Sequence, residues 1–141
     1  MKIAIIGKGN VGKALGHGLR RTGHEVRYGH RDPKEPVREA AEWGDVIILA
    51  VPYRATKDAA EEIGSAADGK VLIDVTNALD QNGKLAAGFT TSAAEELQKL
   101  LPKTRVVKAF NTCSLETRAL EEWVKSNSQR SLPATIRYRS K

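Results

Sequence analysis

A glycine-rich turn near the amino terminus constrains the fold of this chain more than any other feature. Ile3 to Ile6 is a continuous apolar run, typical of a strand buried on both faces, and a G-x-G-x-x-G pattern follows it directly. From Val11 to Arg21 apolar residues recur at helical spacing, with Asn10 expected to cap this helix and Gly23 to end it. A strand, a glycine turn and a helix in this order are typical of a dinucleotide-binding βαβ unit. The pattern consists of Gly7, Lys8, Gly9, Asn10, Val11 and Gly12.

Each glycine of this turn has its own expected role. Gly7 permits the tight turn, Gly9 lets the backbone approach a pyrophosphate, and Gly12 lets the helix pack close to the strand. The amide groups at the start of the helix would then face the anion. Gly16, one helical turn later, is expected to serve packing alone. The alternative is that the whole turn serves packing and binds nothing.

The rest of the chain continues to alternate between strand and helix patterns. This alternation predicts an α/β fold with a doubly wound parallel sheet, right-handed crossovers and helices on both faces, which is the Rossmann NAD(P)-binding fold. Further strands are expected at Glu25 to Tyr28, Asp45 to Val51, Val71 to Val75 and Arg105 to Phe110, and helices at Lys34 to Glu42, Ala55 to Ile63 and Ala93 to Leu101.

Length and charge divide the chain into a body and a tail. The 141 residues suffice for one domain, which we expect to span residues 1–125, and Leu115 to Val124 is a candidate last helix. Residues 1–124 contain 18 Lys and Arg and all 17 Asp and Glu, so the body is nearly neutral. Residues 126–141 lack acids and periodicity, and we expect a disordered or truncated basic tail rather than a nucleic-acid-binding surface.

Apolar runs and cysteine content exclude several other classes. No apolar stretch approaches the roughly 20 residues of a membrane helix, and the first strand begins directly after Met1 without a signal-peptide pattern. We therefore expect a cytoplasmic protein. The single Cys113 excludes a disulfide framework and a cysteine-rich zinc site, and no metal site is predicted. Cys113 is interpreted as a small buried hydrophobe, although a reactive thiol is the alternative.

The end of the second expected strand bears on the choice of dinucleotide. An NAD site normally has an acid there, about 20 residues after the glycines, which accepts hydrogen bonds from the adenosine ribose. This chain has His30 and Arg31 instead, and a guanidinium favours a 2′-phosphate. The sequence therefore favours NADP, with Lys34 as a further candidate contact. NAD remains an alternative cofactor, because a small shift of register would bring the carboxylate of Asp32 to the ribose.

The carboxyl ends of the other strands complete the expected ligand crevice. Val51, Pro52 and Tyr53 follow the third strand and are candidates to border the dinucleotide. Asn77 and Asn111 follow later strands and are candidates for hydrogen bonds to nicotinamide or ribose, although local turn capping explains them equally well. No catalytic acid, base or nucleophile is assigned.

Several segments within residues 1–112 together resemble the NADP oxidoreductases that depend on coenzyme F-420. The resemblance implies hydride transfer between NADP and a deazaflavin, or in broader relatives a flavin, iron or imine acceptor. It also implies that the cofactor performs the chemistry while the protein supplies orientation and excludes water. The segments are Met1 to Gly7 with its glycine loop, Arg31, Leu49 to Pro52, Val71 to Asn77, Ser92 to Leu97 and Val107 to Thr112.

The resemblance also assigns roles to individual positions. It implies that Lys8 to Val11 hold the pyrophosphate, and that His30, Arg31 and Lys34 hold the 2′-phosphate. By the same resemblance, the residues beside the nicotinamide are Val51, Pro52 and Asn77.

The end of the chain departs from this family. Its members continue past the Phe-Asn-Thr strand into a further αβ portion that helps to form the acceptor pocket and often the dimer contact, and residues 113–141 do not resemble that portion. We expect either a truncated or frameshifted product or an ending specific to its lineage.

Two function classes remain, an NADP-dependent oxidoreductase acting as a homodimer, and a non-catalytic or regulatory NADP-binding module without a complete acceptor site. Binding of S-adenosylmethionine is a weaker third alternative, since it would call for an acid after the second strand.

Overall fold

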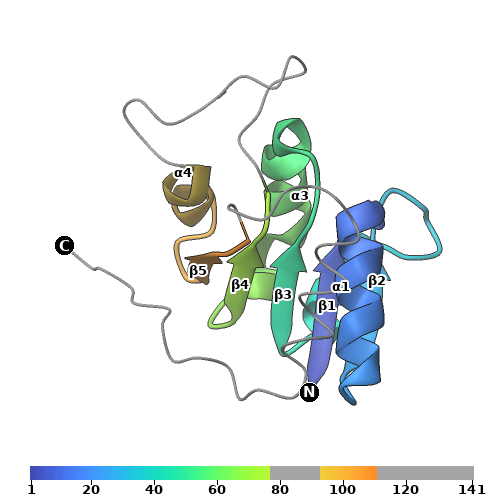
Figure 1. Ribbon diagram of the computed structural model, residues 1–141. Helices are drawn as coiled ribbons and strands as arrows, with labels where there is room; N and C mark the ends of the chain where they lie inside the picture. Colours follow the sequence, from blue (N-terminus) through green and yellow to red (C-terminus); the bar gives the residue numbers. More distant parts are fainter. Residues whose placement is uncertain (77–92, 111–141) are drawn as a thin grey trace.

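A computed structural model describes residues 1–76 and 93–110 of the chain (Figure 1). Within these residues, five strands form one parallel sheet in the order β2-β1-β3-β4-β5. The expected doubly wound α/β fold is therefore confirmed. The strands are β1 (Lys2–Ile6), β2 (Glu25–Gly29), β3 (Val46–Leu49), β4 (Val71–Asp74) and β5 (Arg105–Lys108).

The helices cover both faces of the sheet, as expected. Helix α1 packs on one face against β1 and β2, whereas α2, α3 and α4 lie side by side on the other face. From β1 the chain adds β2 on one side and then β3, β4 and β5 on the other, so the switch point of the topology lies between β1 and β3. Doubly wound sheets form their ligand crevice at this point. The helices are α1 (Asn10–Arg21), α2 (Val37–Trp43), α3 (Thr56–Ile63) and α4 (Ala93–Leu100), with short 3-10 helices η1 (Tyr53–Ala55) and η2 (Gly64–Ala67).

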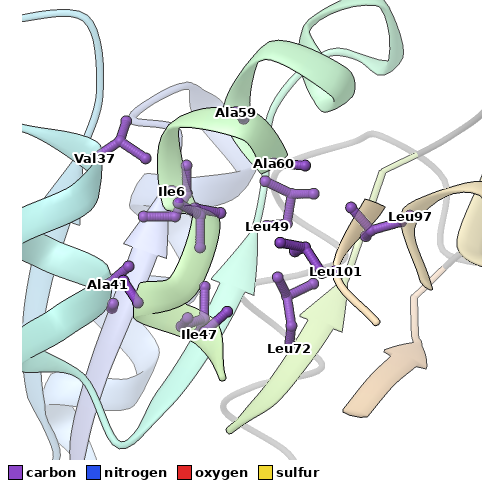
Figure 2. Close-up of a cluster of buried hydrophobic side chains, with 14 of the residues drawn as sticks. Ile6, Val37, Ala41, Ile47, Leu49, Ala59, Ala60, Leu72, Leu97 and Leu101 are labelled. Carbon is purple, nitrogen blue, oxygen red and sulfur yellow. The ribbon is translucent and has the colours of Figure 1, made fainter. Parts of the chain in front are cut away.

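Two apolar clusters hold the helices on the sheet. The larger cluster lies under α2, α3 and α4, where Ile47, Leu49 and Leu72 of the central strands are fully buried (Figure 2). The smaller cluster lies under α1, where Ile5 is fully buried against Leu15 of the helix. Because successive strand residues alternate between the two clusters, β1 and β3 read as continuous apolar runs in the sequence.

Helix α1 begins one residue earlier than expected, and Asn10 does not cap it. Gly9 is the capping residue: its backbone is extended (φ −77°, ψ −169°), and its carbonyl accepts the first helical hydrogen bond, from Lys13 N–H at 2.9 Å. Asn10 is already helical. Among residues 1–76 and 93–110, no side chain caps this end of the helix, which leaves its first amide groups available to a ligand.

Helix α2 begins at Val37 rather than at Lys34, so the expected start was wrong. Pro36 is its extended capping residue (φ −63°, ψ 138°). A residue that precedes proline is disfavoured in the helical conformation, and Glu35 is therefore excluded from the helix. Residues 30–36 form a loop instead, closed by hydrogen bonds from His30 N–H to Glu35 O and from Glu35 N–H to Asp32 O.

Several expectations concern residues 77–92 and 111–141, which lie outside the described part of the chain. They include the roles of Asn77, Asn111 and Cys113, the helix at Leu115 to Val124 and the tail at residues 126–141. In the part that is described, no helix has the length and apolarity needed to cross a membrane.

Candidate functional site

The carboxyl edge of the sheet brings the loops after β1, β2 and β3 together. In Figure 1 the arrows of β1, β3 and β4 point toward this upper edge. Ile6 pairs with Gly29 at the end of β2 and with Leu49 at the end of β3. The loops continue this pairing, because Gly7 N–H donates to Gly29 O at 2.9 Å. The glycine turn is thus fixed between two neighbouring loops.

Gly7 and Gly12 are required by the fold itself. Gly7 has a left-handed φ of +107°, and a Cβ at this position would lie 2.2 Å from the carbonyl oxygen of Ala50. A Cβ at Gly12 would lie 2.1 Å from the carbonyl oxygen of Gly7. Their expected roles in the tight turn and in close helix packing are confirmed. Gly16 also serves packing, because the hydroxyl of Tyr28 occupies the place of its missing side chain.

Gly9 differs from the other two glycines of the pattern. Its φ of −77° is open to any residue, and apart from its chain neighbours no atom of the described residues lies within 4 Å of the place where its Cβ would be. Packing and backbone conformation therefore give no reason for glycine here. The open space lies beside the uncapped start of α1, where the backbone can approach an anionic ligand closely.

A carboxylate that the sequence analysis did not single out lies at the centre of the site. Lys8, in the glycine turn, donates from Nζ to both oxygens of Glu35, at 2.8 Å to Oε1 and 2.6 Å to Oε2. His30, directly after β2, donates from Nε2 to the same Oε2 at 2.5 Å. An ammonium and an imidazole N–H thus converge on one oxygen atom, which defines a small anion-binding position between two loops.

The hydrogen bonds of His30 also define its tautomer. Nδ1 accepts a hydrogen bond from the backbone N–H of Asp32 at 3.3 Å, so Nδ1 carries the lone pair and Nε2 the hydrogen. This arrangement aims the Nε2–H donor at the anion-binding position.

These contacts change the acidity of Glu35. Hydrogen bonds from Lys8 outweigh the opposing effect of partial burial, and together with a weaker contribution from His30 they lower the pKa of the Glu35 carboxyl below its usual 4.5. The carboxylate is therefore fully ionised at neutral pH, and it stays so in mildly acidic solution.

Glu35 is expected to contribute to acid sensitivity. A carboxyl whose pKa is lower in the folded protein stabilises the fold above its unfolded pKa of about 4.5, and the contribution is lost as pH falls through the lower folded value. The free energy of unfolding of Glu35→Gln should therefore fall less below pH 4.5 than that of the wild type. Urea unfolding across this pH range measures the difference. The exposed Glu39→Gln serves as control, and parallel curves for wild type and Glu35→Gln would contradict the prediction.

The other residues expected near a 2′-phosphate lie on the same loop but are not drawn into the cluster. Arg31 and Lys34 are exposed, and neither side chain has an ion pair or hydrogen bond with residues 1–76 or 93–110. Asp32 has a local role, because its Oδ1 accepts the backbone N–H of Lys34 at 2.9 Å. The loop thus presents two free cations beside the Lys8–Glu35–His30 cluster.

The loop after β3 borders the glycine turn. Val51 is half-buried and approaches the position of the missing Gly7 side chain to 3.1 Å, and Pro52 beside it is exposed. Tyr53 turns away from the turn toward α4, where its hydroxyl donates to Glu96 Oε2 at 3.0 Å. Burial and then the nearby Glu96 carboxylate raise the pKa of the Tyr53 hydroxyl. This contact anchors the loop to α4.

Removing the Tyr53 hydroxyl should weaken the anchor. We expect Tyr53→Phe to lower the free energy of unfolding by about 1 kcal/mol, the usual net value of one hydrogen bond. Denaturant unfolding measures the change. Tyr28→Phe is the matched control, because the Tyr28 hydroxyl has no hydrogen bond with the described residues. Equal stabilities of Tyr53→Phe and wild type would show that the contact does not hold the loop.

Asp74 at the end of β4 is fully buried and paired. Lys108 on β5 donates from Nζ to its Oδ2 at 3.0 Å and also to the carbonyl oxygen of Thr76, while the Thr76 N–H donates to its Oδ1 at 2.8 Å. Both carboxylate oxygens are thus occupied by groups of the chain. This supports a structural role for Asp74, which fixes the path of the chain as it leaves β4.

Glu35 was not predicted as a site residue, because it lies beyond the end of the second strand, where such an acid is expected. The usual signal for an acid at an adenosine ribose is a residue directly after the second strand. Glu35 instead meets His30, the residue at this strand end, from five residues further along, because the loop folds back on itself. The sequence signal that could have indicated this is Pro36 directly after Glu35, because a proline there predicts that the helix begins only after the loop.

Comparison with known protein families gives a match over the amino-terminal half of the chain. Residues 2–38 and 34–78 match the family described as NADP oxidoreductase coenzyme F420-dependent. These residues include the glycine turn, the loop with Glu35, and β3 and β4.

Individual proteins agree with this match. The chain is 34% identical to the F420-dependent NADP reductase of Methanothermobacter marburgensis, over 81% of its own length and 64% of that protein. It is 31% identical to the metalloreductase STEAP3 of Rattus norvegicus, over 80% of its own length and 25% of that protein. It therefore spans less than two thirds of the length of both relatives.

A solved structure shows the same fold. The crystal structure of a protein from Arthrobacter sp. FB24, assigned as an F420-dependent NADP reductase, superposes with a TM-score of 0.76 at 29% identity. The superposition covers 81% of this chain and 64% of that protein.

Proposed function

Because the chain belongs to the NADP oxidoreductase family that depends on coenzyme F-420, we propose that it binds NADP(H) and takes part in hydride transfer between NADP and a deazaflavin or flavin-like acceptor. The described part of the chain corresponds to the dinucleotide-binding portion of such an enzyme. The nicotinamide ring supplies the hydride, and the acceptor takes up that hydride together with a proton from solvent.

The glycine turn is the observation that carries this proposal. Gly7 and Gly12 are required by the fold, but Gly9 borders open space beside an uncapped helix start. A turn that served packing alone would give no reason for a glycine at that position. The geometry therefore fits a pyrophosphate held by backbone amides of Lys8 to Val11.

The neighbouring loops extend this assignment to the rest of the dinucleotide. The adenosine half would lie beside the loops after β1 and β2, which carry Lys8, His30, Arg31 and Lys34. Lys8 and His30 already hold an anionic group. Val51 and Pro52 lie beside Gly7, where the nicotinamide half would leave the glycine turn. Asn77 belongs to the same proposal by resemblance to the family. These residues bind and orient the cofactor, and we assign none of them to proton transfer.

Anaerobic stopped-flow oxidation of NADPH tests the proposal. The full chain is mixed with NADPH and, in separate experiments, with coenzyme F-420, a free flavin and a ferric chelate. Loss of the reduced-nicotinamide absorbance with one of these acceptors is the expected result. Binding of NADPH without oxidation by any acceptor would instead favour a non-catalytic or regulatory NADP-binding module. Absence of NADPH binding would refute both.

Cytoplasmic location, homodimer formation and the division into residues 1–125 and 126–141 remain predictions. Homodimer formation is tested by sedimentation of the full chain, and the division by limited proteolysis. A cut confined to residues 126–141 is expected, and rapid cleavage within the sheet would contradict the proposed domain.

A further inference from the structure

The carboxylate of Glu35 occupies a position on which donors from two neighbouring loops converge. Its Oε2 lies 2.6 Å from Lys8 Nζ and 2.5 Å from His30 Nε2, and these donors come from the loops after β1 and β2. In dinucleotide-binding folds these two loops surround the adenosine ribose. The Glu35 carboxylate therefore lies between the loops that, in such folds, surround the ribose and its 2′-substituent.

The two donors are placed without the help of Glu35. The ammonium of Lys8 lies 5.4 Å from the centre of the Tyr28 ring, with which it makes a cation–π contact that does not involve Glu35. The ring of His30 is oriented by the Asp32 N–H, which donates to Nδ1. Both donors would therefore still converge on the same position if the Glu35 carboxylate left it.

The Glu35 side chain can leave without unfolding its loop. The loop is closed through the backbone of Glu35, whose N–H and carbonyl bond to Asp32 and His30. The carboxylate adds no bond to any other described residue, and about a third of the side chain (32%) is exposed to solvent. Rotation about its side-chain bonds would carry the carboxylate into water, where it stays hydrated.

We propose that Glu35 is a specificity-determining residue: its carboxylate is an internal stand-in for the 2′-phosphate, and NADP must displace it to bind. This inference rests on the proposed NADP-binding function. While Glu35 holds Lys8 and His30, only the fraction of molecules with the carboxylate swung out is ready for a 2′-phosphate, and the apparent affinity falls by that fraction. NAD lacks the phosphate and needs no displacement. Glu35 therefore lowers the ratio of NADP affinity to NAD affinity, which the cations of this loop raise.

Replacement of Glu35 by an uncharged residue of the same shape tests the proposal. A surface ion pair and a net hydrogen bond are each worth about a fivefold factor, so the weaker contacts of the uncharged amide with Lys8 and His30 should tighten NADPH binding by about 3- to 25-fold. NADH binding should stay unchanged. Titration calorimetry of Glu35→Gln and wild type with NADPH, NADH, 2′,5′-ADP and 5′-ADP gives the four affinities, and the two shorter nucleotides isolate the phosphate from the nicotinamide.

Glu39→Gln is the matched control. Glu39 is exposed on α2, one turn from the loop, and its replacement changes the net charge by the same amount. An equal gain in Glu39→Gln would mean that general electrostatics, and not displacement, tightened the binding, which would overturn the proposal. A thermal melt of each variant confirms that the proteins compared are folded.

The remaining outcomes separate this inference from the proposed function. An unchanged ratio of NADPH to NADH affinity in Glu35→Gln would overturn the inference while leaving NADP binding intact. Weaker NADH binding in Glu35→Gln would also overturn it, because Glu35 would then accept hydrogen bonds from the ribose. If wild type and variant bound none of the four nucleotides, the proposed function itself would fail.

Discussion

Gly9→Val is expected to abolish NADPH binding in a protein that still folds. A valine side chain would enter the space that the pyrophosphate needs, and the loop amides would lose their contacts with it. Loss of two charge-assisted hydrogen bonds, each worth about 1.5 to 3 kcal/mol, corresponds to an affinity at least about 100-fold lower. No other single change in the turn separates binding from folding as clearly.

This separation follows from the different surroundings of the three glycines. Gly9 has an ordinary extended backbone and open space around the missing side chain. A side chain at Gly7 or Gly12 would instead approach a backbone carbonyl oxygen to about 2 Å (2.2 and 2.1 Å). Gly12→Ala should therefore lose stability as well as binding, whereas Gly9→Val should keep the melting temperature of the wild type.

Calorimetric titration with NADPH and a thermal melt of the same sample measure both properties. Lys13→Val is the control, because it places the same β-branched residue at an exposed position of the first turns of α1. It should bind NADPH like the wild type. Undiminished affinity in folded Gly9→Val would refute the assignment of the pyrophosphate to this turn.

The strands and their arrangement in one parallel sheet were predictable because their sequence signals are local and strong. Ile3 to Ile6 and Val46 to Leu49 are uninterrupted apolar runs, and such runs between helical segments fit only a buried parallel sheet. The glycine turn was likewise predictable, because it lies between a strand pattern and a helix pattern. For these elements burial and local pattern point to the same answer.

The element boundaries that were wrong depend on backbone conformation rather than on polarity. Asn10 has the chemistry of a capping residue, but the turn needs Gly9 in the extended conformation and therefore starts the helix at Asn10. Lys34 and Glu35 continue a plausible helical pattern, yet Pro36 forces them into the loop. Hydrophobic periodicity carries no information about either effect.

The least predictable part of the site is the Lys8–Glu35–His30 cluster. Its members come from two loops and lie 27 and 5 residues apart in the sequence. Their meeting requires both the register between β1 and β2 and the fold-back of the second loop. Lys8 was predicted as a cofactor contact by resemblance to the family, and His30 by its place after the second strand and the same resemblance. Nothing in the sequence indicated which carboxylate they share.

Arg31→Ala is expected to weaken NADPH binding by about 10- to 150-fold, because it removes one charge-assisted hydrogen bond of about 1.5 to 3 kcal/mol. Arg31 is exposed next to His30, and within the described residues its guanidinium has no competing ion pair. It is thus free to bind a 2′-phosphate in the fork geometry that arginine favours. NADH binding should change little, and added salt should narrow the preference of the wild type for NADPH.

Two variants serve as comparisons for Arg31→Ala. Arg21→Ala removes the same charge from the far end of α1 and should leave both affinities unchanged. Asp32→Ala tests the alternative in which the site prefers NAD through a carboxylate at the ribose. Because Asp32 caps its own turn through the Lys34 N–H, we expect its removal to loosen the loop without weakening NADH binding selectively. Equal NADPH affinities of wild type and Arg31→Ala would contradict the assignment of Arg31.

The double variant Arg31→Ala/Glu35→Gln tests whether Arg31 and the cluster of Lys8, Glu35 and His30 contact the same phosphate. If one phosphate contacts Arg31 and also replaces the Glu35 carboxylate, the two substitutions act on the same bound group and their effects are coupled. The gain in NADPH affinity from Glu35→Gln should then be smaller in the Arg31→Ala background. Without Arg31 the phosphate is held more weakly and spends less time in contact with Lys8 and His30. Independent sites would give additive free energies within about 0.5 kcal/mol. Additivity would therefore place Arg31 on a different part of the dinucleotide from the group that displaces Glu35.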